Sequence, residues 1–230
     1  MHTEQWRLDA DPIWEAIFRH PFLTGLADGT LDQAAFRYFV RQDYVYLRDF
    51  SHVLAMAAAR SPLRGDERIL LRHAEIVHAV EAELHQSLAP VLGLDPSELA
   101  ASVPGPVTRA YADHLVRAAW ERPYAVLLAA VLPCYWIYRE VGQRLAGTDP
   151  GFQPYRDWIE TYAGDLYGSS VDEARGIAER SAERASARER QEAREAFWVS
   201  SRYEWLFWEQ AWSREAAFRT AELPASPPSS

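Results

Sequence analysis

The sequence predicts an all-α protein that folds as a single helical bundle. Apolar residues recur at helical spacing almost everywhere, and no convincing stretch alternates apolar and polar residues as a half-buried strand does. Proline and glycine divide the chain into pieces of helical length, yet no repeat and no long linker divides it into domains. We therefore expect one helical domain over residues 1–222 and a disordered Pro/Ser tail over residues 223–230.

Capping residues and prolines define the helices expected in the first half of the chain. Asp11 and Pro12 predict an N-cap followed by proline at the first helical position. Thr30 and Gln33 form a capping box that opens a longer helix. The expected helices cover residues 11–19, 30–60 and 66–88, followed by a short turn capped by Asp95. In the third helix, the residues expected to face inward are Ile69, Ile76, Val80 and Leu84.

The second half contains five expected helices, at residues 107–120, 124–145, 154–162, 171–188 and 189–219. Pro133 lies inside the helix over 124–145. Because proline removes one helical hydrogen bond, we expect a kink just before Cys134. The helix over 171–188 is amphipathic and rich in charge, so we expect it to form an outer face of the bundle.

The charge balance argues against a nucleic-acid-binding protein. The 33 acidic residues outnumber the 24 basic ones, for a formal net charge of −9, and no basic stripe is present to neutralise phosphates. All of the basic residues are arginine. Without lysine, the chain cannot form a Schiff base through that residue, which excludes lysine-anchored pyridoxal phosphate.

Nothing in the sequence predicts export or a membrane span. The first residues lack the apolar core of a signal peptide, and the longest apolar run covers only residues 125–134. A membrane span needs roughly 20 apolar residues. A single cysteine gives no internal disulfide. We expect a soluble, cytoplasmic protein.

Cys134 is the one cysteine of the chain and the first candidate for chemistry. It lies in the apolar run 132–142, with Tyr138 one helical turn further along the same face. Cysteine becomes a strong nucleophile at modest cost, which makes Cys134 a candidate for covalent catalysis. The alternative is a buried free thiol that packs as a small hydrophobe, the commoner case for a lone cysteine.

Two carboxylates occupy positions that the helical pattern assigns to the core. Glu204 lies in the apolar stripe of the last helix, and Asp43 lies in that of the helix over 30–60. A buried carboxylate is costly unless it is paired. Each residue therefore either forms an ion pair with an arginine or has a raised pKa that suits it to proton transfer. Together with an inward thiol, they favour an active site.

Four tyrosines from four different helices are also expected at apolar positions: Tyr46, Tyr111, Tyr138 and Tyr162. Packing with a satisfied hydroxyl explains any one of them alone. If they converge on the thiol and the carboxylates, they form a slot for an aromatic heterocycle with polar groups on its rim.

A metal site is a second interpretation of the same chain. Glu75 and His78 have the Glu-x-x-His spacing of di-iron bundles, and Asp49 and His52 have a similar spacing. Both pairs lie partly off the inward stripes, which argues against a closed di-iron centre. His20 has the ring of a haem ligand, but the pair His20-Pro21 is more typical of a helix end.

Four segments together resemble the TenA/thiaminase II family of aminopyrimidine aminohydrolases. They are residues 39–50, 132–142, 155–162 and 200–208, and they contain Asp43, Tyr46, Cys134, Tyr138, Tyr162, Glu204 and Phe207. Their order and spacing agree over nearly the whole chain, and the cysteine and glutamate segments are specific in combination.

This resemblance implies a fold and a reaction. The fold is the all-α haem-oxygenase-like bundle, assembled as a homotetramer, with neither haem nor metal nor another cofactor. The reaction is hydrolysis of 4-amino-5-aminomethyl-2-methylpyrimidine to the hydroxymethylpyrimidine in the salvage of degraded thiamine, and many members also cleave thiamine itself.

The resemblance also implies a role for each site residue. Cys134 adds to the pyrimidine ring as the nucleophile, and Glu204 exchanges a proton with a ring nitrogen. Asp43 holds the ring amino group. Among the aromatic residues, Tyr111 bonds near the thiol, Tyr138 orients Glu204, and Tyr46 and Tyr162 flank the ring, with Phe207 nearby.

Two other functions remain open at this point. One is a metal- or cofactor-dependent oxidase of the same bundle type. The other is a non-catalytic pyrimidine-binding protein, although binding alone needs no nucleophile such as Cys134.

Overall fold

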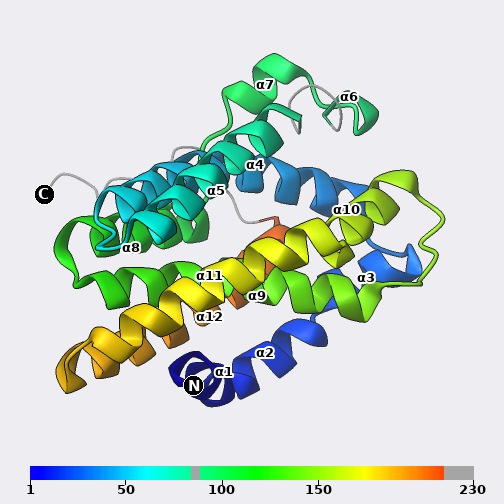
Figure 1. Cartoon of the computed structure of the whole chain (residues 1–230). Helices are drawn as coiled ribbons and strands as arrows, with labels where there is room; N and C mark the ends of the chain where they lie inside the picture. The colour runs from blue at the N-terminus through cyan, green and yellow to red at the C-terminus, as the bar shows by residue number, and fades with distance from the viewer. Residues whose placement is uncertain (84–88, 215–230) are drawn as a thin grey trace, which may run out of the picture.

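The computed structural model describes residues 1–83 and 89–214, which form helices joined by short turns, with no strand among them (Figure 1). The all-α prediction is therefore confirmed. The helices are α1 (His2–Asp9), α2 (Asp11–Phe18), α3 (Pro21–Asp28), α4 (Gln33–Ala59), α5 (Arg64–Glu83), α6 (Ala89–Val91), α7 (Pro96–Ala100), α8 (Pro106–Glu121), α9 (Tyr124–Leu145), α10 (Gln153–Ala163), α11 (Asp165–Arg184) and α12 (Ala187–Ser213).

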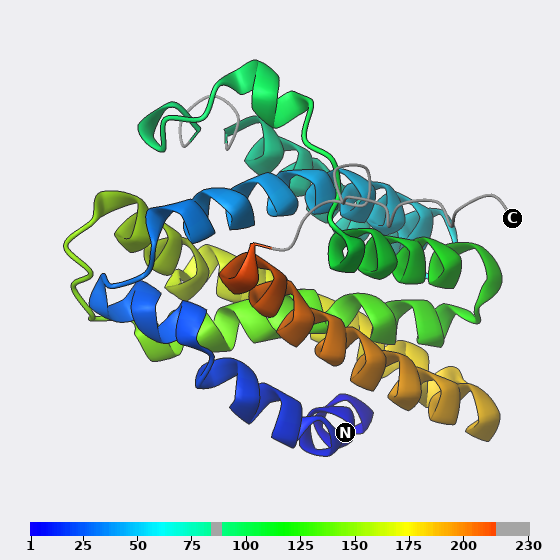
Figure 2. The same ribbon diagram turned by 180° about the vertical axis from the view of Figure 1, so that it is seen from behind.

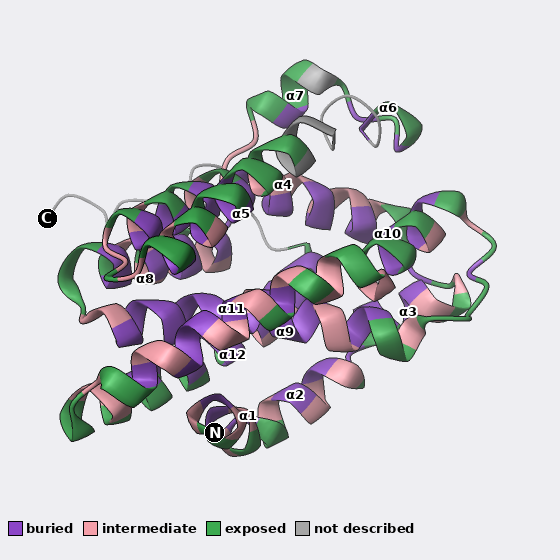
Figure 3. Cartoon of the chain, viewed as in Figure 1, coloured by how far each residue is buried: buried purple, intermediate pink, exposed green. Residues whose placement is uncertain are grey.

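Helix α9 runs through the middle of the bundle and is surrounded by the other long helices. It packs mainly against α12, α11 and α10, while α4 packs against α5 and α8 (Figures 1 and 2). Almost every residue between Ala125 and Tyr138 is buried, so α9 is apolar on all sides, as a central helix must be. The buried residues face the inside of the bundle and the exposed ones lie on its outer surfaces (Figure 3).

The length and composition of α9 would also allow it to cross a membrane. It is the one helix among the described residues with both properties, and 83% of its apolar window is buried inside the bundle. Burial of this extent is typical of the core helix of a folded bundle.

The predicted ends of α9 are confirmed, and α9 continues through Pro133. Two predicted caps are wrong. Asp32, not Thr30, caps α4, because the Asp32 carboxylate accepts the N–H of Ala34 while the Thr30 hydroxyl bonds to Asp28. At α2 the N-cap is Ala10, so Asp11 is already helical.

The inward face of α5 differs from the predicted one. Ile76 is 39% exposed, whereas Leu70, His73 and Ala74 are buried. The stripe is therefore offset from the one expected, and a histidine lies on the inner face of this helix. Other predictions lie outside the described residues. They concern the ends of two helices at residues 88 and 219, the inward side chains of Val80 and Leu84, and the tail 223–230.

Two helices near the N-terminus were not expected from the sequence. Tertiary contacts stabilise them, since Trp6 of α1 and Phe22 of α3 are buried in the core. His20 follows the end of α2, as predicted, and its Nδ1 caps α3 by accepting the N–H of Phe22.

Candidate active site

An apolar cavity opens where α4, α5, α9, α10 and α11 meet. It encloses about 700 Å³, including the space at its mouth. Its walls are made by Asp43, Leu47, Phe50, His73, Ile76, Val77, Cys134, Tyr135, Tyr138, Thr161, Tyr162, Tyr167 and Ser170. Four tyrosines among these residues make the cavity suitable for a flat, aromatic ligand.

Cys134 places its thiol on the wall of this cavity. It follows Pro133 in α9 and is half-buried, which leaves the sulfur accessible from the cavity. Burial raises the pKa of the thiol well above its ordinary value, and the nearby Glu204 raises it further, while the Tyr46 hydroxyl acts in the opposite direction. The sulfur therefore carries its proton, which has to leave when the sulfur reacts.

Glu204 of α12 is buried next to this thiol. It is 1% exposed, and the Tyr111 hydroxyl donates to its Oε1 at 2.7 Å. Burial raises the pKa of Glu204 to about 8, with a further contribution from Asp43, while the Tyr111 hydrogen bond opposes the change. No arginine pairs with Glu204 among the ion pairs of residues 1–83 and 89–214, so the structural ion pair considered above is absent there.

Asp43 is the second inward carboxyl and lies directly on the cavity wall. Burial raises its pKa to about 7. Two carboxyl groups with pKa values near neutrality therefore lie close to one thiol, and each can hold or release a proton at physiological pH.

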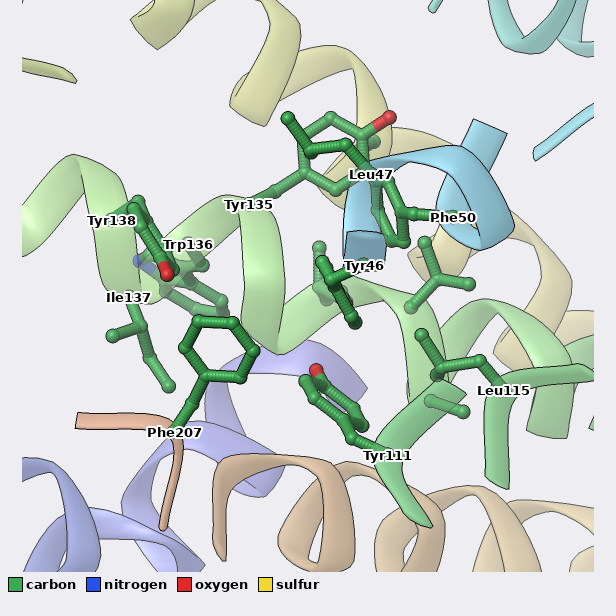
Figure 4. Close-up of a cluster of buried hydrophobic side chains, with 14 of the residues drawn as sticks. Tyr46, Leu47, Phe50, Tyr111, Leu115, Tyr135, Trp136, Ile137, Tyr138 and Phe207 are labelled. Atoms are coloured by element: carbon green, nitrogen blue, oxygen red, sulfur yellow. The ribbon is translucent and has the colours of Figure 1, made fainter. Parts of the chain in front are cut away.

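The predicted aromatic residues divide into two layers. Tyr138 and Tyr162 line the cavity, with their ring centroids 4.8 Å apart. Tyr46, Tyr111 and Phe207 pack behind the wall, where Tyr46 is stacked 5.0 Å from Tyr111. Figure 4 shows these three rings gathered together, with Tyr135 projecting from α9 toward Leu47 and Phe50.

Two predicted positions differ from the structure. Tyr46, which was expected to flank the ring, is not among the residues that line the cavity. The hydroxyl that binds Glu204 belongs to Tyr111, whereas the ring of Tyr138 packs against Tyr162 and Trp208. Tyr111 is fully buried and stacked between Tyr46 and Tyr203, and this packing directs its hydroxyl toward the carboxyl group.

Three residues of the site were missed by the sequence interpretation. His73 and Tyr135 line the cavity and bond to each other, with Tyr135 Oη 3.2 Å from His73 Nδ1. The Tyr167 hydroxyl, also on the wall, donates to the backbone carbonyls of Cys134 and Tyr135. Tyr135 could have been found because it is adjacent to Cys134 in the sequence. His73 and Tyr167 could not, because nothing in the local sequence of α5 or α11 places these helices at the cavity.

Residues 7–214 match the model of the TENA/THI-4/PQQC family. The chain belongs to this family. It is 37% identical, over 93% of its own length and 90% of the relative's, to a Bacillus subtilis protein named aminopyrimidine aminohydrolase. A TenA homologue from P. horikoshii superposes with a TM-score of 0.84 at 29% identity, covering 93% of this chain and 99% of the homologue.

The haem-oxygenase-like fold is shown as well. A domain from Shewanella denitrificans described as having a heme oxygenase-like fold superposes with a TM-score of 0.71 over 92% of both chains. At 15% identity this likeness concerns the fold alone.

The two metal-ligand pairs do not assemble a centre in this member of the TENA/THI-4/PQQC family. His52, Glu75 and His78 are exposed, and the described ranges contain no group of three or more side chains arranged to hold a metal ion. For its chemistry this site offers one thiol, two carboxyl groups, the His73 imidazole and several hydroxyls.

Proposed function

We propose that the chain is an aminopyrimidine aminohydrolase that converts 4-amino-5-aminomethyl-2-methylpyrimidine and water to the hydroxymethylpyrimidine and ammonia. The observation that carries this proposal is the position of Cys134 on an aromatic cavity wall, beside two carboxyl groups whose pKa values are about 7 and about 8. The name and 37% identity of the Bacillus subtilis relative support the substrate class.

In the proposed complex, the pyrimidine ring lies between aromatic walls. Tyr138 and Tyr162 flank it within the cavity, while Tyr46, Tyr111 and Phe207 form the layer behind. Asp43 accepts a hydrogen bond from the ring amino group, because its carboxyl is the acidic side chain on the wall. The enclosed site fixes the ring relative to the sulfur, which lowers the entropic cost of the addition.

The first half of the reaction begins when Cys134 Sγ bonds to a ring carbon. Glu204 gives its proton to a ring nitrogen, and the thiol proton replaces it on the carboxyl group through the neighbouring Tyr46 and Tyr111 hydroxyls. This addition ends the aromaticity of the ring. The electron pair of the ring then expels the amine from the methylene. The amine takes the proton of the ring nitrogen and leaves as ammonia, so that an exocyclic double bond remains.

In the second half, water adds to the exocyclic methylene. A carbon–oxygen bond forms, one water proton leaves, and the electron pair returns to the ring. The carbon–sulfur bond then breaks, Cys134 recovers its proton, and aromaticity returns. The whole sequence requires a nucleophile, proton carriers and water, and the described residues supply the first two.

We further propose the setting of this activity. The chain acts in the cytoplasm as a homotetramer with one domain over residues 1–222, in the salvage of degraded thiamine. The family resemblance supports this setting.

The test is an ammonia-release assay on purified protein with the aminomethylpyrimidine, with thiamine in a parallel sample. We expect ammonia and the hydroxymethylpyrimidine in equal amounts. Protein that binds the pyrimidine but releases no ammonia would contradict the proposal and favour the non-catalytic pyrimidine-binding function. Turnover that requires bound iron would favour the oxidase.

A further inference from the structure

We propose that Tyr135, His73 and Glu173 form the base that activates water in the second half of the reaction. The inference rests on the proposed function and assigns the proton acceptor that the hydration step requires. Neither the sequence interpretation nor the family resemblance gave these three residues a role.

The three side chains form a continuous hydrogen-bonded chain. Tyr135 Oη lies 3.2 Å from His73 Nδ1, and His73 Nε2 lies 2.9 Å from Glu173 Oε2. An ionised carboxylate can only accept, so Nε2 carries the ring proton and Nδ1 is free to accept one. The Arg72 guanidinium binds both oxygens of Glu173 at 2.5 Å and holds the carboxylate in place.

This chain connects the cavity to the surface. Tyr135 and His73 both line the cavity and are nearly fully buried, whereas the Glu173 side chain is 36% exposed on α11. Among the residues that line the cavity, Ile76 and Thr161 are exposed and Ser170 is half-buried, so they form its solvent-facing rim. Water that enters the cavity can therefore reach the wall that Tyr135 and His73 form.

Glu204 is placed less well for this step. It is 1% exposed and is not among the residues that line the cavity, so only a ring already bonded to the neighbouring Cys134 comes within its reach, and its hydrogen-bond partner is Tyr111. Two proton carriers at different depths suit a reaction in two halves. Glu204 gives a proton to the ring, and the chain of Tyr135, His73 and Glu173 accepts a proton from the water.

Burial keeps His73 neutral and therefore ready to accept a proton. Burial lowers its pKa, while Glu173 on α11 opposes that change and Arg72 on its own helix adds to it. From α4, the group across the cavity is Asp43, and from α9 it is Tyr135. The imidazole is therefore neutral near neutral pH, and Glu173 stabilises the cation once it forms.

The proposed step balances in atoms and electrons. The water oxygen bonds to the exocyclic methylene, and the double-bond electrons return to the ring. One water proton passes to Tyr135 Oη as the Tyr135 proton passes to His73 Nδ1. The imidazolium then returns this proton to the Cys134 sulfur when the carbon–sulfur bond breaks.

The test separates the two halves of the reaction in the full-length variants Tyr135→Phe and His73→Gln. We expect each to release about one equivalent of ammonia per chain at nearly the wild-type rate and then to turn over at least about tenfold more slowly, because a base contributes on the order of 10²–10⁴-fold. Azide, an anionic nucleophile that needs no deprotonation, should restore turnover and yield the azidomethylpyrimidine.

Tyr155→Phe provides the matched control. It also removes a buried tyrosine hydroxyl with a hydrogen-bond partner, the carbonyl of Leu31, but that hydroxyl does not line the cavity. We expect Tyr155→Phe to release ammonia without an initial burst and without a slow phase after it. Azide should not change its rate.

The outcomes are distinguishable. Wild-type protein that releases no ammonia contradicts the proposed function, and this inference with it. Active wild-type protein whose Tyr135→Phe and His73→Gln variants slow equally in both halves, or do not respond to azide, contradicts the inference alone.

Discussion

The pKa values of two buried glutamates in the same bundle are shifted in opposite directions. Glu179 of α11 accepts the backbone N–H groups of His2 and Thr3 and the Thr3 hydroxyl, at 2.7, 2.9 and 2.8 Å. Burial alone would raise its pKa, but these hydrogen bonds outweigh burial and hold the pKa below its usual value. Glu204 accepts one hydrogen bond, from Tyr111, and burial raises its pKa to about 8.

The difference shows that the number of donors, more than burial, separates a structural carboxylate from a proton carrier. Three donors keep Glu179 ionised and tie the N-terminus of the chain to α11. A single phenol leaves Glu204 able to take and release a proton near neutral pH. Glu204 thus has one donor, whereas Glu179 has three.

The largest effect is expected in the cavity region, at the thiol. Cys134→Ser should reduce ammonia release on the order of 10⁴-fold or more, because a hydroxyl is a far weaker nucleophile than a thiol of similar size. Pyrimidine binding and the melting temperature should change little. Assays of rate and of binding on the same preparation check this, and retention of more than about a tenth of the rate would contradict covalent catalysis.

Replacing Glu204 should lower the rate without lowering the stability. Glu204→Gln keeps the acceptor for Tyr111 but cannot exchange a proton, so we expect kcat to fall by about 10²–10⁴-fold. Kinetics and thermal unfolding together measure this. A variant that unfolds more easily yet keeps its rate per folded molecule would make Glu204 a structural carboxylate.

The pH dependence of stability should reveal the same glutamate. The pKa of Glu204 rises from an ordinary 4.5 to about 8 on folding, so the folded state keeps a proton that the unfolded chain releases. Stability should therefore fall as pH rises from about 5 to about 8, by at most about 1.4 kcal/mol per pH unit for each such carboxyl.

Urea unfolding of wild type and Glu204→Gln at several pH values measures this slope. The variant has no proton to lose, so its stability should fall less steeply with pH over this range. Identical slopes in the two proteins would mean that the Glu204 carboxyl has an ordinary pKa.

Glu179, which accepts three hydrogen bonds, should behave in the opposite way. Its replacement should lower the stability and leave the rate unchanged. Glu179→Gln has one acceptor oxygen where the carboxylate has two, so a donor of His2 or Thr3 is left unpaired at a cost of about 1–3 kcal/mol. The wild-type contribution is present above about pH 4.5 and is lost as pH falls through the lowered pKa of Glu179. Denaturant unfolding checks the loss, and an altered kcat per folded molecule would contradict a purely structural role.

The smallest expected effect is that of chelation. The proposed steps need a thiol, proton carriers and water, so ammonia release should be unchanged after exhaustive dialysis against a chelator. Metal analysis of the dialysed protein provides the control. Activity that disappears on dialysis and returns with iron would support the oxidase.

The fold was predictable from the sequence wherever proline marks a boundary and the helix is strongly apolar. The bounds of α9 were predicted correctly for this reason. The cap of α4 was not, because Thr30 and Asp32 lie two residues apart and either side chain can accept a free N–H group. The cap of α2 was not, because its N-cap Ala10 has no side chain that could form a capping hydrogen bond. Helix α1 was missed because its stability depends on a distant residue, Glu179.

The site was predictable only in part, because some of its contacts depend on how distant helices pack. An acidic residue within an apolar stripe marks Glu204 and Asp43 as buried, and both are. Which hydroxyl meets Glu204 depends on how α8 and α12 pack, so Tyr111 could not be chosen over Tyr138. His73 was missed because the predicted inward stripe of α5 was offset.

The most direct test of the central claim uses the fact that the chain has one cysteine. Alkylation of Cys134, followed by intact-mass measurement, gives the fraction of modified chains, and the same samples are assayed for ammonia release. We predict that activity falls in proportion to this fraction and reaches zero at one alkyl group per chain, and that bound pyrimidine slows the modification. A fully alkylated protein that still releases ammonia at the wild-type rate would contradict the account.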